Sequence, residues 1–294
     1  MMKMSQSQAG FTLVELIVVV VITAILSSVM VQFITVPVES YVDVSRRVRL
    51  TDIAETAIQR LSYDIKRALP NSIRVGCGGR CVEFLRSPTG GRYRAGPPGD
   101  VLSFNPADAD TSFPVLGPLN FISEVTAGSG SGACASNTAS CVVVYNTGLA
   151  GSNAWNLDNM ATLTAIGSSP LAISFDNGGF SSGLTAFPAS SPKQRFFLVD
   201  TPVKYLCDLS AGTLRRYQGY NVVSNESSVD SHVELLGLSN PAEHALLADQ
   251  VSDCSFTYQA GTPSRNAVLS IALSVAESGE DINLLQQLSV VNQP

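Results

Sequence analysis

The chain has 294 residues, with 18 basic and 24 acidic side chains, a net charge of -6 and a pI near 4.9. This acidic balance argues against broad nucleic-acid binding through the folded part of the protein. Beyond an apolar N-terminal segment, the length leaves room for one large or two small globular domains, and we favour one.

An apolar stretch near the N-terminus contains a single ionisable side chain. From Phe11 to Ile34 only Glu15 can carry a charge, and a helix of this length, roughly 36 Å, can cross a bilayer. A secretory signal peptide has a shorter apolar core that is followed by a small-residue cleavage site, whereas here the small residue Gly10 precedes the core. A carboxylate at the centre of a bilayer costs about 2.5 to 3.5 kcal/mol, so we expect Glu15 to have a partner charge.

The segment Gly10-Phe11-Thr12-Leu13-Val14-Glu15-Leu16 resembles the N-terminal motif of the type IV prepilin family, which includes major pilins, minor pilins and type II secretion pseudopilins. The resemblance implies a leader over residues 1–10, cleavage between Gly10 and Phe11 by a prepilin peptidase, and methylation of the new Phe11 amine. It also implies that Glu15 of one subunit pairs with the Phe11 amine of a neighbour and so sets the register of a filament. The alternative is an ordinary single-span anchor with a stray acid.

A second helical pattern follows the apolar stretch over Tyr41–Leu69, and Pro37 is predicted to bend or briefly interrupt the helix before it. Apolar residues recur at steps of three and four, and Pro70 ends the pattern; they are Val44, Val48, Ala54, Ala57, Ile58, Leu61, Ile65, Ala68 and Leu69. We assign most of the charged residues, Asp64 included, to the opposite face. The cluster Arg46, Arg47 and Arg49 could be a patch for anionic lipid or DNA, but the interleaved acids favour a solvated helix face.

Short strand-like runs between turn residues follow from Asn71 onward. The predicted strands are Ile73–Val75, Cys81–Leu85, Val101–Phe104, Cys141–Tyr145, Gln194–Val199, Val203–Cys207, Thr213–Tyr217, Val251–Tyr258, Ala267–Val275 and Leu284–Val291. Two hairpins are predicted, one joining the strands at 203–207 and 213–217 and the other those at 267–275 and 284–291. The region 106–192 is predicted to be a loop-rich insertion. The fold class is therefore α+β: a membrane or filament-core helix over 11–36, an amphipathic helix over 37–70, and a mostly antiparallel β-rich head over 71–294.

Six cysteines allow 15 complete pairings. Their spacing favours Cys77 with Cys81 and Cys134 with Cys141, which leaves Cys207 with Cys254. Export of the head to an oxidising compartment would support disulfides. A structural metal is disfavoured because there is no CxxC pair and the histidines are far from the cysteines in sequence; buried reduced thiols are the next alternative.

Other candidate sites have ordinary explanations. The run Gly128–Gly132 lacks the lysine of a phosphate-binding loop, and we expect a flexible loop. His232 and His244 fit surface loops better than a metal site. The acids Asp108, Asp110, Asp249 and Asp253 lack an EF-hand pattern, and the aromatic residues Trp155, Phe196 and Phe197 fit a core better than a glycan site. No catalytic residue, metal or cofactor is predicted.

Later segments extend the resemblance to minor pilins of the mannose-sensitive haemagglutinin (MSHA) type and, in general shape, to the larger minor pseudopilins. The matching segments are Pro70–Val75, Phe197–Asp200, Tyr205–Cys207, Leu214–Tyr217 and parts of Gly279–Pro294.

The resemblance implies a non-enzymatic minor pilin that primes assembly at or near the tip. The protein is expected first in the inner membrane, with its head in the periplasm, and then in the pilus. Its expected partners are the prepilin peptidase, major and minor pilins and the membrane, but no nucleic acid. The alternatives are a tip adhesin and a secretion pseudopilin. Unlike major pilins, this chain has no glycine or proline in the apolar run before Pro37.

Overall fold

The computed structural model describes residues 10–180, 183–262 and 265–294, so the predicted leader lies, apart from Gly10, outside the described residues. Two compact units meet between Arg49 and Leu50, and we call Leu50–Pro294 the head unit. The long helix α1 (Leu13–Ile65) is continuous across this boundary and contains Pro37. The predicted interruption at Pro37 is therefore wrong, because one lost backbone hydrogen bond does not end a helix that has many intact turns on both sides.

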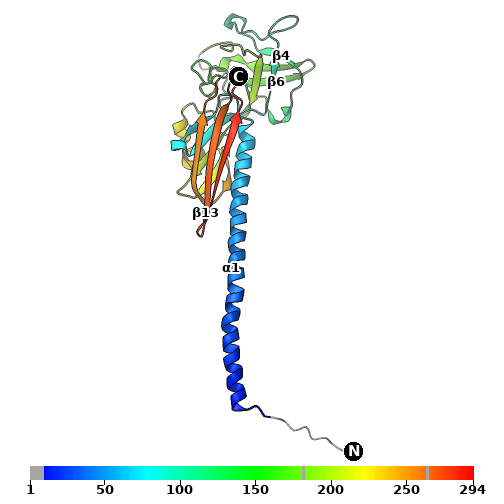
Figure 1. The fold of residues 1–294 in the computed structure, drawn as a ribbon. Coiled ribbons are helices and arrows are strands. Elements are labelled where there is room, and N and C mark those ends of the chain that lie inside the picture. Colours follow the sequence, from blue (N-terminus) through cyan, green and yellow to red (C-terminus); the bar gives the residue numbers. More distant parts are fainter. Residues whose placement is uncertain (1–9, 181–182, 263–264) are drawn as a thin grey trace, which may run out of the picture. The chain divides into compact units, whose positions relative to one another are not determined.

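The head unit confirms the α+β class, with α1 followed by antiparallel sheets (Figure 1). A five-stranded sheet has the order β1-β2-β9-β10-β11. Its strands are β1 (Arg74–Gly76), β2 (Cys81–Arg86), β9 (Thr201–Asp208), β10 (Thr213–Gln218) and β11 (Glu243–Ala248). A three-stranded sheet, orange to red in Figure 1, consists of β12 (Val251–Gln259), β13 (Ala267–Glu277) and β14 (Glu280–Val290). Both predicted hairpins, β9 with β10 and β13 with β14, are confirmed.

The largest apolar core lies between the last turns of α1 and these two sheets. Leu50, Ala54, Ala57, Leu61 and Ile65 are each at most 1% exposed and pack with apolar residues of β2, β9, β12 and β13. The predicted apolar stripe is correct from Ala54 onward, whereas Val44 and Val48, in the other unit, are 63% and 65% exposed. The opposite face of the five-stranded sheet is covered by residues 219–242, which include the short helix α2 (His232–Leu236).

The middle of the chain forms a closed antiparallel barrel of order β3-β4-β7-β6-β5-β8. Its strands are β3 (Thr89–Tyr93), β4 (Ser112–Leu116), β5 (Cys141–Val144), β6 (Met160–Ser168), β7 (Leu171–Asp176) and β8 (Arg195–Val199). An aromatic core fills it, with the Phe113 and Phe196 rings 5.0 Å apart and Tyr93 fully buried. In sequence the barrel is inserted between β2 and β9 of the five-stranded sheet. Arg86 at the end of β2 and Thr201 at the start of β9 are nevertheless direct partners.

The barrel corrects the prediction of a loop-rich insertion over 106–192. The strands β3, β4, β6, β7 and β11 were missed, and the run Val101–Phe104, predicted as a strand, lies in a loop. Two adjacent glycines in β3 and Pro114 in β4 lower the strand propensity of these segments. Closure of the barrel provides their partners, because β3 pairs with both β4 and β8.

Two of the three predicted cysteine pairs are disulfides, Cys77–Cys81 and Cys134–Cys141. The third pair differs from the prediction, because Cys207 in β9 and Cys254 in β12 are free thiols, 4% and 3% exposed. Both belong to the core beneath α1, where a thiol packs as a small apolar group. A hydrogen bond with Cys207, together with burial, raises the pKa of Cys254, so this cysteine stays protonated.

A buried carboxylate joins α1 to the five-stranded sheet. Asp64 is 1% exposed, contrary to its predicted place on the solvated face, and it accepts hydrogen bonds from the Tyr205 hydroxyl (2.8 Å) and from Arg216 Nε (2.5 Å). Burial and the Asp64 charge raise the pKa of Tyr205, which keeps its hydroxyl a donor. A charged helix residue can therefore lie on the packed face, because Tyr205 in β9 and Arg216 in β10 provide hydrogen bonds to its carboxylate.

We predict that Asp64→Ala lowers the free energy of unfolding by about 3 to 5 kcal/mol, because it leaves the buried Arg216 guanidinium without its counter-charge. Urea unfolding of the full chain in detergent measures this change. Glu55→Ala, which removes an exposed carboxylate from the same helix, is the control and should change the value by less than about 0.5 kcal/mol. Equal effects of the two substitutions would contradict the structural role of Asp64.

We also predict that alkylation of the unfolded, unreduced protein labels two of its six cysteines, Cys207 and Cys254. Reduction before alkylation should raise the count to six. Peptide mapping by mass spectrometry identifies the labelled sites. A count of zero before reduction would show that these two thiols oxidise to a third disulfide and would contradict the free thiols in this structure.

Candidate functional site

The helix α1 begins at Leu13, two residues after the predicted cleavage site. Gly10 and Phe11 precede it in an exposed segment, and Phe11 is 80% exposed. Thr12 caps the first turn, because its Oγ1 accepts a hydrogen bond from the Glu15 amide at 3.3 Å and its carbonyl accepts one from the Leu16 amide at 3.2 Å. The cap leaves the Gly10-Phe11 peptide bond outside the helix and open to approach.

The role of Thr12 was missed in the sequence, although a signal for it exists. A threonine followed three residues later by a glutamate is the spacing of a capping box, and Thr12 and Glu15 have this spacing. Glu15 consequently lies in the first turn of α1, where the positive end of the helix dipole favours a carboxylate. The same position brings the charge close to any amine created at Phe11.

The residues after Glu15 form an apolar surface of membrane-spanning length. Leu13–Met30 has a mean hydropathy of 2.7, and none of it is buried within the protein. Two of its hydroxyl groups are bonded to the helix itself: Thr23 Oγ1 donates to the Val19 carbonyl and Ser28 Oγ to the Ile25 carbonyl, both at 2.8 Å. These internal bonds suit an apolar environment, so Glu15 is the single side chain of the span that needs an outside charge.

The basic cluster farther along α1 is interleaved with acids, as expected for a solvated face. Arg46 Nη1 lies 3.1 Å from Asp43 Oδ1, one turn before it. This ion pair between exposed or partly exposed groups contributes little to stability.

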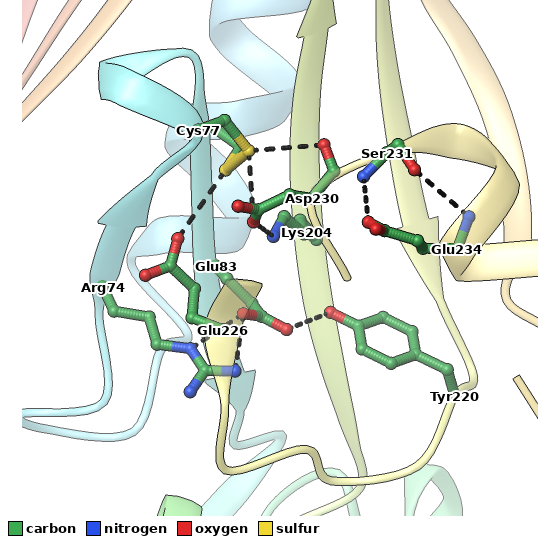
Figure 2. Close-up of a disulfide and its surroundings, with 10 residues drawn as sticks. Arg74, Cys77, Glu83, Lys204, Tyr220, Glu226, Asp230, Ser231 and Glu234 are labelled. Atoms are coloured by element: carbon green, nitrogen blue, oxygen red, sulfur yellow. Dashed lines mark hydrogen bonds and ion pairs between the residues drawn. A yellow bond between two sulfur atoms is a disulfide. The ribbon is translucent and has the colours of Figure 1, made fainter. Parts of the chain in front are cut away.

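The Cys77–Cys81 disulfide lies among charged residues on the far face of the five-stranded sheet (Figure 2). Lys204, fully buried in β9, donates to Asp230 Oδ1 at 3.2 Å, and the same oxygen lies 3.4 Å from Cys77 Sγ. Cys77, Cys81 and Asp230 would be close enough to share a metal ion, but both sulfurs are already joined in the disulfide. This cluster is therefore structural: it neutralises a buried lysine.

Figure 2 also shows a second buried carboxylate, Glu83 of β2. It pairs with Arg74, whose guanidinium lies 2.8 Å away, and it accepts a hydrogen bond from the Tyr220 hydroxyl at 2.6 Å. Arg74 in turn covers the ring of Trp155, and the indole nitrogen of Trp155 donates to the Ser72 carbonyl. Trp155 is 6% exposed, so its predicted place in a core is confirmed.

The two histidines were predicted to lie in surface loops, and this prediction is wrong. They meet at the edge of the five-stranded sheet. His232 is the first residue of α2, and His244 lies in β11 opposite Tyr217 of β10. The Tyr217 hydroxyl and His232 Nδ1 are 2.8 Å apart, and the two imidazole rings are 5.1 Å apart, edge to face. The sequence separation of these residues concealed this contact, which requires the pairing of β10 with β11.

The remaining candidates stay dispersed. Asp108 and Asp110 both bond to Ser103 in a surface loop, whereas Asp249 follows β11 and Asp253 lies in β12. The glycine-rich run 128–132 lies in a loop before β5. Phe196 is buried inside the barrel, and Phe197, its neighbour, is half-buried on the outside.

Comparison with known protein families gives a match for the N-terminal segment. Residues 5–31 match the model of the prokaryotic N-terminal methylation motif, and the match includes Gly10, Phe11 and Glu15. No curated protein and no solved structure matches the chain. The N-terminal segment of this protein is therefore of the type IV pilin or pseudopilin kind, joined to an α+β head.

Proposed function

We propose that this protein is a non-enzymatic minor pilin of an MSHA-type pilus, similar to the one called MshO, that primes filament assembly at or near the tip. One observation carries the proposal. A lone carboxylate, Glu15, lies in the first turn of an exposed apolar helix that begins two residues after the Gly10-Phe11 bond, within the matched methylation motif.

The mechanism begins with processing in the inner membrane. A prepilin peptidase cuts between Gly10 and Phe11, and the new Phe11 amine is methylated but stays cationic. Removal of the leader also removes Lys3, so the mature side chains carry 17 basic and 24 acidic groups, a net charge of -7. The amine supplies the partner charge that Glu15 lacks, because cleavage places a cation at the start of the same helix.

The charge pair acts between subunits. When the helices of several minor pilins associate in the membrane, Glu15 of one subunit and the Phe11 amine of its neighbour attract each other in a medium of low dielectric constant. This pairing sets the stagger between helices, and the major pilin then adds beneath the first complex. The head stays in the periplasm until the growing filament carries it to the cell surface.

We predict that Glu15→Gln reduces the number of surface pili about tenfold or more when it replaces the wild-type protein. The substitution keeps the side-chain volume but removes one member of an ion pair in an apolar environment, a loss of well over 1.4 kcal/mol. Pili are counted by electron microscopy, and immunoblots verify that the variant is made and processed. Thr23→Val, which removes a hydroxyl bonded only to its own helix, is the matched control and should leave pili unchanged.

A deletion strain decides between the roles of the whole protein. Loss of pili supports priming, and normal pilus numbers contradict it. Normal pili together with a loss of protein secretion would instead identify a pseudopilin of a type II secretion system.

The barrel favours a second candidate function, adhesion at the pilus tip. It is a closed unit with its own aromatic core, and it is not needed to complete the sheet from which it emerges. Because Arg86 and Thr201 are paired across β2 and β9, an Asn-Gly turn can replace Ser87–Asp200 and rejoin the two strands as a hairpin.

We predict that this replacement spares piliation but abolishes attachment to surfaces if the protein is an adhesin. Attachment of cells and pilus counts are measured together, and a cooperative thermal transition of the purified variant verifies that the remaining head folds. Unchanged attachment with normal pili would leave the protein a priming subunit only.

A further inference from the structure

A groove with an unusual charge balance runs along the outer wall of the barrel. It consists of two adjoining cavities of about 290 and 330 Å³, which share Gly90 and Phe197 as well as Arg195. One cavity extends toward the end of α1 and reaches Lys66 and Arg67, and the other extends along β3 to Arg92. We call the two together the cationic groove.

The groove is positively charged although the protein is acidic. Four cationic side chains line it, and no aspartate or glutamate is found among its described lining residues. Arg67 is partly neutralised, because it pairs at 2.6 Å with Glu124, a residue that lies outside the groove. Within the described part of the chain, the Arg195 guanidinium donates only to the Gln293 carbonyl, at 3.4 Å, and Lys66 and Arg92 are exposed.

Two of the cations oppose each other. Arg92 of β3 and Arg195 of β8 are direct partners in the antiparallel pair, and like charges in this position are destabilising. Tyr93, next to Arg92, is fully buried in the barrel, so alternation along β3 directs Arg92 outward. An anion bound between the two guanidinium groups would remove the repulsion.

The floor of the groove is flat. A Cβ on Gly90 would lie 2.7 Å from the Phe196 carbonyl oxygen and 3.1 Å from the Phe197 ring, so a larger residue would be forced against β8. Gly90 and Phe197 are themselves direct partners, and the ring lies beside bare backbone. The groove therefore combines an aromatic and backbone surface with two arginines at its side.

We propose that the cationic groove binds an acidic polysaccharide, a chain of sugars that bear carboxylates. Arginine matches a carboxylate in a bidentate geometry, and the half-buried Phe197 ring and the Gly90 backbone offer a flat face to a sugar ring. The net charge of -6 opposes the approach of any polyanion, and it opposes double-stranded DNA more strongly than a polysaccharide because DNA carries more charge per unit length. The groove is a property of the head unit, so it does not depend on whether the protein primes pili.

Calorimetric titration of the full-length protein in nonionic detergent with a hexamer of galacturonic acid tests the proposal. We expect binding that weakens between 0.15 and 0.5 M salt, about tenfold weaker binding for Arg92→Gln or Arg195→Gln, and none detectable for the double variant. Arg80→Gln, which removes an exposed arginine outside the groove, is the matched control and should bind like wild type.

The melting temperature of the protein tests the role of Arg92 without any ligand. Without the oligosaccharide, Arg92→Gln should melt at or above the wild-type temperature, because it removes the repulsion with Arg195. A lower melting temperature would mean that Arg92 is a structural residue and would overturn its role as an unpartnered cation. The same melting curves verify that the variants used in the titration are folded.

Three titration outcomes would overturn the proposal. One is no binding of the hexamer by the wild-type protein, and another is equal binding by the double variant. The third is equal or tighter binding of a fully methyl-esterified hexamer or of a single-stranded DNA of the same charge, which would show that the groove recognises something other than sugar carboxylates.

Discussion

Burial of one face of α1 between Leu50 and Ile65 is the contact on which the head unit depends. These turns pack against apolar residues of both the five-stranded and the three-stranded sheet in one common core. Asp64 adds direction to this contact, because its carboxylate must meet Tyr205 and Arg216. A slide of the helix along the sheets would separate these groups and leave a buried charge unpaired.

The first turns of α1 obey the opposite constraint. Leu13–Met30 buries nothing within its own chain, so its apolar surface requires lipid or other helices, and Glu15 requires a cation from outside the span. One continuous helix thus carries a segment specialised for a partner and a segment specialised for its own head. The barrel is a third specialisation, added through two strands without disturbing the pairing of β2 with β9.

Local patterns predicted the features that depend on neighbouring residues. The apolar stripe of the helix from Ala54 onward, the two hairpins and the short cysteine pairs need no long-range information, and they are correct. The barrel was missed because β3 becomes a strand only through its distant partners β4 and β8. Asp64, the histidine contact and the Arg92–Arg195 pair likewise depend on the register of strands far apart in sequence.

At the N-terminus the sequence showed the motif, and it also held, in the spacing of Thr12 and Glu15, a signal for the cap that was missed. We propose that this chain enters a filament as a processed minor subunit. Mass spectrometry of filaments sheared from cells should detect a peptide that begins at N-methylated Phe11, in trace amounts relative to the major subunit. Absence of this peptide from filaments, with the processed protein retained in the cell envelope, would contradict the claim.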